Sequence, residues 1–194
     1  IDEAGIKSQP TTYHLGYLIA PRINAAGRLT DAKFAIKLLT ETSNKSAKEV
    51  ATELNELNIK RRSLENEVLN AAIAQVETKK QKDNHLTWVA GYNWHPGVIG
   101  IVAARLKEKF YLPAVVFSIN KDGVAVGSAR SVPGIDIGSE IKKLVLSGSL
   151  ISGGGHSMAA GLKSHQNQLN SSMEALELNL GKVDKFSGFK FRAD

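Results

Sequence analysis

The longest regular pattern of apolar and polar positions runs from Ser46 to about Lys79, in a segment without proline or glycine. Its apolar residues recur at alternating spacings of three and four positions: Ala47, Val50, Leu54, Leu57, Leu64, Val68 and Ala71. This spacing predicts one long amphipathic helix with a narrow apolar seam, which Arg61 interrupts. Ser46 followed by Glu49 matches a capping box at the start of this helix. Because such a helix spans about 45 Å, we expect a connector between domains, with a coiled-coil dimerisation helix as the alternative.

Shorter elements follow the polar stretch 81–84. Apolar runs at 86–90, 113–119 and 124–129 predict strands, and the Asp122-Gly123 pair between the last two is typical of a hairpin turn. Helices are predicted at 98–110, 137–146 and 166–180, with a Gly-rich turn and a strand at 158–162 between the last two. Because strands and helices alternate, the expected fold class is α/β: a long connector helix followed by a small domain with a mixed β-sheet flanked by helices.

Ahead of the long helix, we expect a short apolar helix at 13–20 that ends at Pro21. A loop at 22–28 then leads to a second helix at 31–41, with Asp31 at its amino end. The expected domain organisation is therefore the tail of a preceding domain at 1–44, the connector helix at 45–83, the small α/β domain at 84–182 and a tail at 183–194. Since the first residues read as mid-chain sequence, we expect the chain to be a piece of a longer protein.

Composition adds a preference for an anionic partner. The chain has 194 residues, 42% of them hydrophobic, which is ordinary for a soluble globular protein. Its apolar runs, such as 98–104, are far shorter than a membrane span, so no membrane association is expected. There is no cysteine, which excludes disulfides and thiolate metal sites and agrees with a reducing cytoplasm. The net charge of +6 favours an anionic partner such as nucleic acid without requiring one.

The run Gly153-Gly154-Gly155-His156 is the first candidate for binding phosphate. Read as a turn without side chains, it brings backbone N–H groups close to an anion, and the histidine adds a directed donor. The alternative is a plain surface turn beside an uninvolved histidine.

Two further candidates lie at the ends of predicted strands. His95 precedes the helix at 98–110, where it either donates to a phosphate or caps the turn. Arg130 closes an apolar strand, with Ser128 on the same face, and Ser131 shares that face only if the chain turns there. Such a group suits a phosphate, since the guanidinium can donate two parallel hydrogen bonds to it and the hydroxyls can donate to the remaining phosphate oxygens. The alternative is a salt bridge from Arg130 to Asp136, which is itself a candidate helix N-cap.

The expected loop at 22–28 contributes Arg22, Asn24 and Arg28, residue types that suit contacts with a nucleic-acid backbone. Pairing of these arginines with carboxylates is the alternative. The histidines are scattered along the chain without metal-ligand spacing: His14, His85, His95, His156 and His165. No nucleophile elbow or Walker loop is present. The sequence therefore predicts phosphate-binding groups without a catalytic centre.

Four motifs, taken in order, carry a resemblance to a known family. They read APRINAAGRL at 20–29, WHPGVIGIVA at 94–103, SARS followed by PGIDI at 128–137, and GGGH followed by MAAG at 153–161. Together they resemble the RecJ family of single-strand-specific 5′-to-3′ DNA exonucleases in the DHH phosphoesterase superfamily. The similarity runs from about residue 13 to residue 162.

The resemblance implies a metal-binding domain joined by a long helix to a smaller DHH-associated domain, with substrate in the cleft between them. Residues 1–44 would end the metal domain, and residues 84–182 would form the associated domain. The ions, Mn²⁺ or Mg²⁺, would be held by the metal domain and activate water there, so that no metal binds this chain and the isolated chain is inactive.

The resemblance also implies a role in DNA repair and recombination, in the cytoplasm. The expected partner is single-stranded DNA, with single-strand-binding and repair proteins as further candidates. The residues expected to contact the DNA are Arg22, Asn24, Arg28, His95, Ser128, Arg130, Ser131, Gly153, Gly154, Gly155 and His156.

The sequence departs from the family in two places. Ser157 replaces the alanine usual after the histidine, and the residues beyond Leu162 show no pattern of an oligonucleotide-binding barrel. Two other functions remain open: a DHH phosphodiesterase of short oligonucleotides or cyclic dinucleotides, and a non-catalytic nucleic-acid-binding module.

Overall fold

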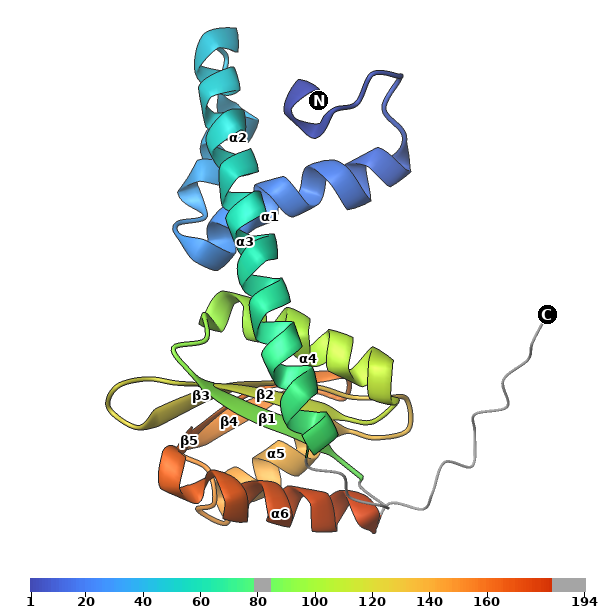
Figure 1. Cartoon of the computed structure of the whole chain (residues 1–194), viewed down its shortest axis with the longest axis vertical. Helices are drawn as coiled ribbons and strands as arrows, with labels where there is room; N and C mark the ends of the chain where they lie inside the picture. The colour runs from blue at the N-terminus through green and yellow to red at the C-terminus, as the bar shows by residue number, and fades with distance from the viewer. Residues whose placement is uncertain (79–84, 183–194) are drawn as a thin grey trace, which may run out of the picture. The chain divides into compact units, whose positions relative to one another are not determined.

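The computed structural model describes residues 1–78 and 85–182, and it divides the chain into two compact units (Figure 1). Unit 1 comprises residues 1–67, and unit 2 begins at Val68. The boundary falls inside the long helix α3 (Asn44–Thr78), so each unit contains part of that helix. The long helix predicted from the apolar seam is confirmed.

All regular elements of unit 1 are helices, and one of them corrects a prediction. It contains η1 (Asp2–Ala4), the π-helix η2 (His14–Ile19), α1 (Ala20–Leu29), α2 (Lys33–Thr40) and the first part of α3. The prediction that Pro21 ends a helix and that a loop follows is wrong. Pro21 lies in the first turn of α1, which continues directly from the π-helix η2, so the chain stays helical through the proline. The arginine-containing motif is therefore helical.

The core of unit 1 joins α1, α2 and α3. Ala26, Val50 and Leu54 are buried at its centre, and the side chains packed against them are Phe34, Leu38 and Leu57. Two of the three buried residues are seam positions of α3. Arg61, which interrupts the seam, finds its hydrogen-bond partners on the same helix. Its guanidinium lies 2.6 Å from Oε2 of Glu65 and donates to Oδ1 of Asn58 at 3.1 Å.

The predicted capping box is wrong, since α3 begins at Asn44 and not at Ser46. The hydroxyl of Ser46 donates to Oε2 of Glu41 at 2.6 Å instead. This hydrogen bond, followed by the one from the Ser43 backbone, lowers the pKa of the Glu41 carboxyl. The polar groups before the helix are thus satisfied by Glu41, which the capping-box pattern does not include.

Unit 2 is built on a mixed sheet, as predicted, but the sheet has five strands where the sequence predicted four. Its strands are β1 (Thr87–Tyr92), β2 (Ala114–Ile119), β3 (Val124–Arg130), β4 (Ser152–His156) and β5 (Ala159–His165). Their order in the sheet is β1-β2-β3-β5-β4, with β1 and β2 parallel and all other neighbours antiparallel. The predicted Gly-rich turn is wrong, because residues 152–156 form the edge strand β4.

Helices cover the two faces of this sheet unequally (Figure 1). One face carries α4 (Pro96–Phe110), and the other carries α5 (Ile137–Leu146) and α6 (Leu169–Gly181), which follows η3 (Gln166–Gln168). The large core lies on the face of α5 and α6 and includes Val115, Phe117, Leu162, Ile141, Met173 and Leu176. Among the described residues, no helix combines the length and the hydrophobicity that crossing a bilayer requires.

Two local predictions in unit 2 are confirmed. Asp136 is the N-cap of α5, where its carboxylate accepts hydrogen bonds from the backbone N–H and the hydroxyl of Ser139 at 3.0 and 2.8 Å. These hydrogen bonds lower the pKa of the Asp136 carboxyl. Asp122-Gly123 forms the turn between β2 and β3, and Gly123 adopts a φ of 72°, a conformation that favours glycine.

Candidate nucleic-acid interface

The candidate site lies on the sheet face that carries α4. This helix packs against β1, β2 and β3, while β5 and β4 continue beyond it. The residues of β5 on this face are exposed: Gly161, Lys163 and His165. Their neighbours in the strand face the opposite side and are buried: Ala160, Leu162 and Ser164. We call the surface formed by this side of β5 and β4, together with Ser128 and Arg130 of β3, the open face.

Strand register brings Arg130 and His156 to the same row of the open face. Arg130 pairs with Ala159, and His156 pairs with the same alanine from the other side. Residues directly opposite one another in antiparallel strands point to one face, so both side chains flank Ala159. Two strand spacings separate their Cα atoms by about 10 Å. His156 is exposed. Arg130 of β3 and His156 of β4, both predicted phosphate ligands, thus have their side chains on one surface.

Ser128 and Arg130 are held in place by contacts on this face. Nη1 of Arg130 donates to Oγ of Ser128 at 3.0 Å and to the carbonyl of Ala129 at 2.8 Å. Gly100 of α4 provides room for the guanidinium, because a Cβ there would lie 3.0 Å from Nη2 of Arg130 and 3.1 Å from Oγ of Ser128. The side chain of Arg130 is therefore oriented by its own strand and by the surface of α4.

The glycines of β4 serve two different purposes. A Cβ at Gly153 would lie 2.7 Å from Ile141 of α5, and one at Gly155 would lie 2.3 Å from the carbonyl oxygen of Ala159. Packing therefore requires glycine at both positions. At Gly154 an added Cβ would meet nothing within 4 Å. Gly154 pairs with Gly161, which is equally unobstructed, and Gly161 pairs with Ser128. The central row of the open face is thus bare backbone.

His95 caps α4, one of the two roles considered for it. Its Nδ1 accepts a hydrogen bond from the backbone N–H of Gly97 at 3.0 Å. The side chain is half-buried. Capping occupies one ring nitrogen and leaves Nε2 as the atom for any contact with a ligand.

Ser131 is placed unlike the other predicted residues of unit 2. It is 1% exposed, and its hydroxyl donates to the carbonyl of Ile135 at 2.8 Å. Its backbone N–H donates to the carbonyl of Met158 at 2.9 Å, which ties the end of β3 to the turn between β4 and β5. The chain does turn after Arg130, but the turn directs the Ser131 hydroxyl inward.

The three predicted residues of unit 1 lie on α1. Asn24 and Arg28 are exposed and one helical turn apart, so they share one side of the helix. Arg22 is half-buried, where Nε donates to Oδ1 of Asn55 at 2.9 Å and Nη1 to the carbonyl of Leu18 at 2.6 Å. The carboxylate pairing considered for Arg22 is replaced by these neutral acceptors. Sequence reasoning placed the three residues on a loop, because it took Pro21 as a helix end.

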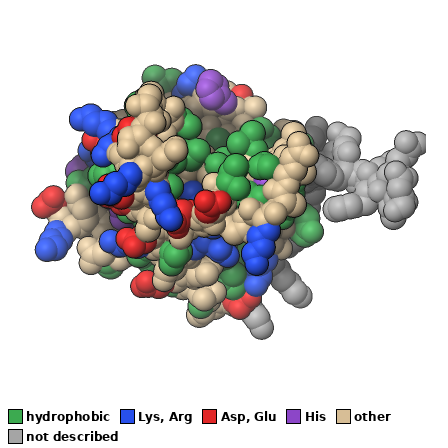
Figure 2. Space-filling model, turned by 90° about the horizontal axis from the view of Figure 1, so that it is seen from above, with side chains coloured by type: hydrophobic (Ala, Val, Ile, Leu, Met, Phe, Trp, Pro, Cys, Tyr) green, Lys and Arg blue, Asp and Glu red, His purple; other side chains and the backbone are tan. Residues whose placement is uncertain are grey.

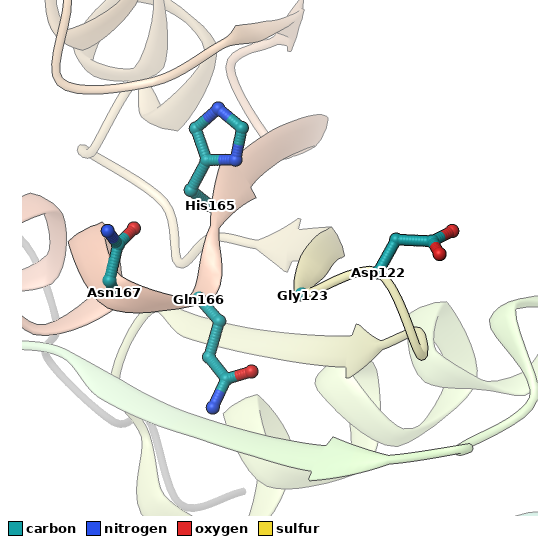
Figure 3. A pocket seen from close by; sticks show the side chains of 5 residues that line it. All are labelled: Asp122, Gly123, His165, Gln166 and Asn167. Carbon is teal, nitrogen blue, oxygen red and sulfur yellow. The ribbon is translucent and has the colours of Figure 1, made fainter.

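A pocket and the titratable side chains of the described residues are the other candidates for a second site. An open pocket of about 390 Å³ is lined by Asp122, Gly123, His165, Gln166 and Asn167. Its labelled side chains point away from one another and do not converge on a ligand position (Figure 3). Within residues 1–78 and 85–182 no three histidine, aspartate or glutamate side chains come together as a metal site. Figure 2 shows hydrophobic side chains gathered on one face, with lysines and arginines distributed around them.

Comparison with known proteins matches this arrangement to one family. The family model of the DHHA1 domain matches residues 83–182. The chain is 38% identical over 149 residues to the single-stranded-DNA-specific exonuclease RecJ of Bacillus subtilis, a match covering 76% of this chain and 19% of that protein. It is 37% identical over 153 residues to RecJ of Escherichia coli, covering 76% of this chain and 26% of that protein. The chain thus spans about a fifth to a quarter of the length of these relatives.

Solved structures agree in fold. RecJ of Thermus thermophilus in complex with Mg²⁺ superposes with a TM-score of 0.77 and 28% identity, covering 91% of this chain and 27% of that one. A second structure, exonuclease RecJ bound to manganese, gives a TM-score of 0.78 and 28% identity, covering 93% of this chain and 44% of that one. CDC45 from Entamoeba histolytica shares the fold alone, with a TM-score of 0.59 at 11% identity over 84% of this chain and 37% of that one.

Proposed function

The chain belongs to the DHHA1 domain family, and we propose that it is the part of a RecJ-type exonuclease that binds the phosphate backbone of single-stranded DNA. The complete enzyme would degrade single strands from the 5′ end in DNA repair and recombination, in the cytoplasm, together with single-strand-binding and repair proteins. The domain limits expected from the sequence, 1–44, 45–83 and 84–182, are part of this proposal.

One observation carries the proposal: strand register gathers Ser128, Arg130 and His156 around bare backbone at Gly154 and Gly161. A guanidinium, a hydroxyl and an imidazole can each donate to a phosphate oxygen, and charge-assisted hydrogen bonds are the stronger kind. The absence of side chains between them lets a sugar-phosphate backbone approach the sheet closely. None of these groups distinguishes one base from another, so binding is independent of sequence.

The remaining residues of the proposed site belong to each unit separately. In unit 2, these are Nε2 of His95 and the backbone of 153–155. In unit 1, Arg22, Asn24 and Arg28 form a separate group on α1. Because the hydroxyl of Ser131 is buried and bonded internally, we propose that Ser131 shapes the turn and does not contact DNA.

Among residues 1–78 and 85–182, no group of three potential metal-ligating side chains is found. Two RecJ structures contain Mg²⁺ or manganese, and we propose that in the complete enzyme such ions are held by residues outside this chain. Such ions would activate a water molecule for phosphodiester cleavage. The residues of this chain would bind and orient the strand.

A titration of single-stranded DNA into the purified chain, with Mn²⁺ present and at several salt concentrations, tests the proposal. We expect binding without cleavage, and the logarithm of the association constant should fall linearly with the logarithm of the salt concentration, by about 0.7 per phosphate contacted. Strands of different sequence should bind alike, and long strands better than dinucleotides. Salt-independent binding, or a preference for cyclic dinucleotides, would contradict it.

Replacing Gly100 by alanine should weaken DNA binding without weakening the fold. The new Cβ would crowd Nη2 of Arg130 and Oγ of Ser128, both ends of movable side chains, while alanine favours the helix by about 1 kcal/mol over glycine. We expect an unchanged or higher melting temperature and a loss of affinity smaller than that from deleting the Arg130 guanidinium. Gly16→Ala, where an added Cβ meets nothing within 4 Å, is the control. Equal affinities of the two variants would contradict the role of Gly100.

A further inference from the structure

The open face continues beyond the proposed site in one direction. The row after Ser128, Gly161 and Gly154 contains Val126, Lys163 and Ser152, which pair across β3, β5 and β4. Because this row is two residues further along each strand, its side chains point to the same face as Arg130 and His156. Lys163 is exposed and its two neighbours in the row carry no charge. A cation therefore lies on the same surface as the proposed phosphate ligands.

The glycines between these rows have no packing reason of their own. Glycine within a strand costs about 0.5–1 kcal/mol relative to alanine. Packing explains it at Gly153 and Gly155 but not at Gly154 or Gly161, where an added Cβ meets nothing within 4 Å. Close approach of another backbone is the remaining use of such positions. This second observation points to a ligand that passes over Gly154 and Gly161.

From these placements we infer that a single strand bound at Arg130 and His156 runs along the open face over Gly154 and Gly161, and that Lys163 binds a phosphate further along it. The inference rests on the proposed function and extends it by one position. Lys163 lies about 14 Å along β5 from the row of Arg130, and the bare row lies midway. If one phosphate of the strand lies at the row of Arg130 and the second near the bare row, the third phosphate lies near Lys163.

A negative charge beyond the carboxyl end of β5 limits this path. His165 follows Lys163 on the same face, in the row of Val124. Beyond it, Asp122 lines the neighbouring pocket, and its carboxylate would repel a phosphate. The path that suits a polyanion therefore extends from Arg130 to Lys163 and ends before Asp122.

Two ligands of different length test the position of Lys163. The first is a single strand of about twelve nucleotides, and the second is a 5′-phosphorylated dinucleotide, whose two phosphates reach only the first two rows. Lys163→Gln should weaken binding of the long strand about 3- to 10-fold and reduce the salt slope by about 0.7, while leaving the dinucleotide unaffected. Lys142→Gln, an equal change of charge on α5 at the opposite face, is the matched control.

Gly154→Ala provides the second measurement, because its Cβ would stand in the path of the strand. We expect weaker binding of both ligands with an unchanged or higher melting temperature, because alanine is favoured over glycine within a strand. If Lys163→Gln and Lys142→Gln bind the long strand equally while Arg130→Ala binds it weakly, the inference about Lys163 is wrong and the proposed function stands. If Arg130→Ala also binds it with unchanged affinity, the proposed function fails as well.

Discussion

Arg130→Ala should bind single-stranded DNA about 10- to 100-fold more weakly than the unsubstituted chain. An arginine guanidinium is charged at every relevant pH, and a hydrogen bond to a charged group contributes about 1.5–3 kcal/mol. Its orientation is set beforehand by Ser128, the Ala129 carbonyl and the surface of α4 at Gly100, so little ordering is needed on binding. Fluorescence anisotropy with a labelled strand measures the change.

Lysine at the same position separates charge from shape. Arg130→Lys keeps the charge but loses the fork that reaches a phosphate with two parallel donors, so we expect an intermediate affinity. Lys142→Ala controls for the change in net charge. Within the complete exonuclease, Arg130→Ala should also slow degradation of single strands. A variant that binds and degrades them as well as the unsubstituted enzyme would remove Arg130 from the site.

Gly155→Ala should destabilise unit 2 by about 1–3 kcal/mol, the usual cost of overpacking. Its Cβ would lie 2.3 Å from the carbonyl oxygen of Ala159 and 2.5 Å from the Cα of Ala160. Both are backbone atoms, so relief requires movement of the strand itself. α5 opposes that movement, since Gly138 lies against the backbone of Gly155 and His156. Thermal unfolding followed by circular dichroism measures the loss.

The neighbouring residue supplies the comparison for this variant. At Gly154 an added Cβ meets no atom within 4 Å, so Gly154→Ala should leave the melting temperature unchanged or raise it, although Gly154 lies in the same run of glycines. We therefore expect the two substitutions to differ in kind: Gly155→Ala lowers stability, whereas Gly154→Ala lowers affinity for DNA. Equal melting temperatures for the two would show that the packing of β4 is looser than these distances imply.

Much of the fold was predictable because its signals are local. The α5 helix was predicted at 137–146 and its N-cap at Asp136, since both depend on a few consecutive residues. The long helix α3 followed from its seam, and the turn at Asp122-Gly123 from its residue types. The errors occurred where one sequence allows two structures. Proline is compatible both with the end of a helix and with the first turn of the next, and Pro21 has the second role.

The glycine run at 153–155 is a second place where one sequence allows two structures. Its sequence is compatible with a turn or with a strand, and only the contact with α5 and the pairing with β5 make it strand β4. The sequence allowed the Ser131 hydroxyl to share the face of Arg130 only if the chain turned; the chain turns, and the turn directs the hydroxyl inward to Ile135. Side-chain direction after a turn depends on distant partners, which a local pattern does not contain.

The sequence alone determined the residue types, most of the elements, the mixed α/β class and the resemblance to RecJ through four ordered motifs. Only the tertiary structure decided which residues share a surface. Arg130 and His156 are far apart along the chain, and they share a row because both of their strands pair with β5 at Ala159. The same register separates glycines needed for packing from glycines left bare, and it adds Lys163 to the open face. Strand register depends on long-range pairing, so it emerges only when the sheet is assembled.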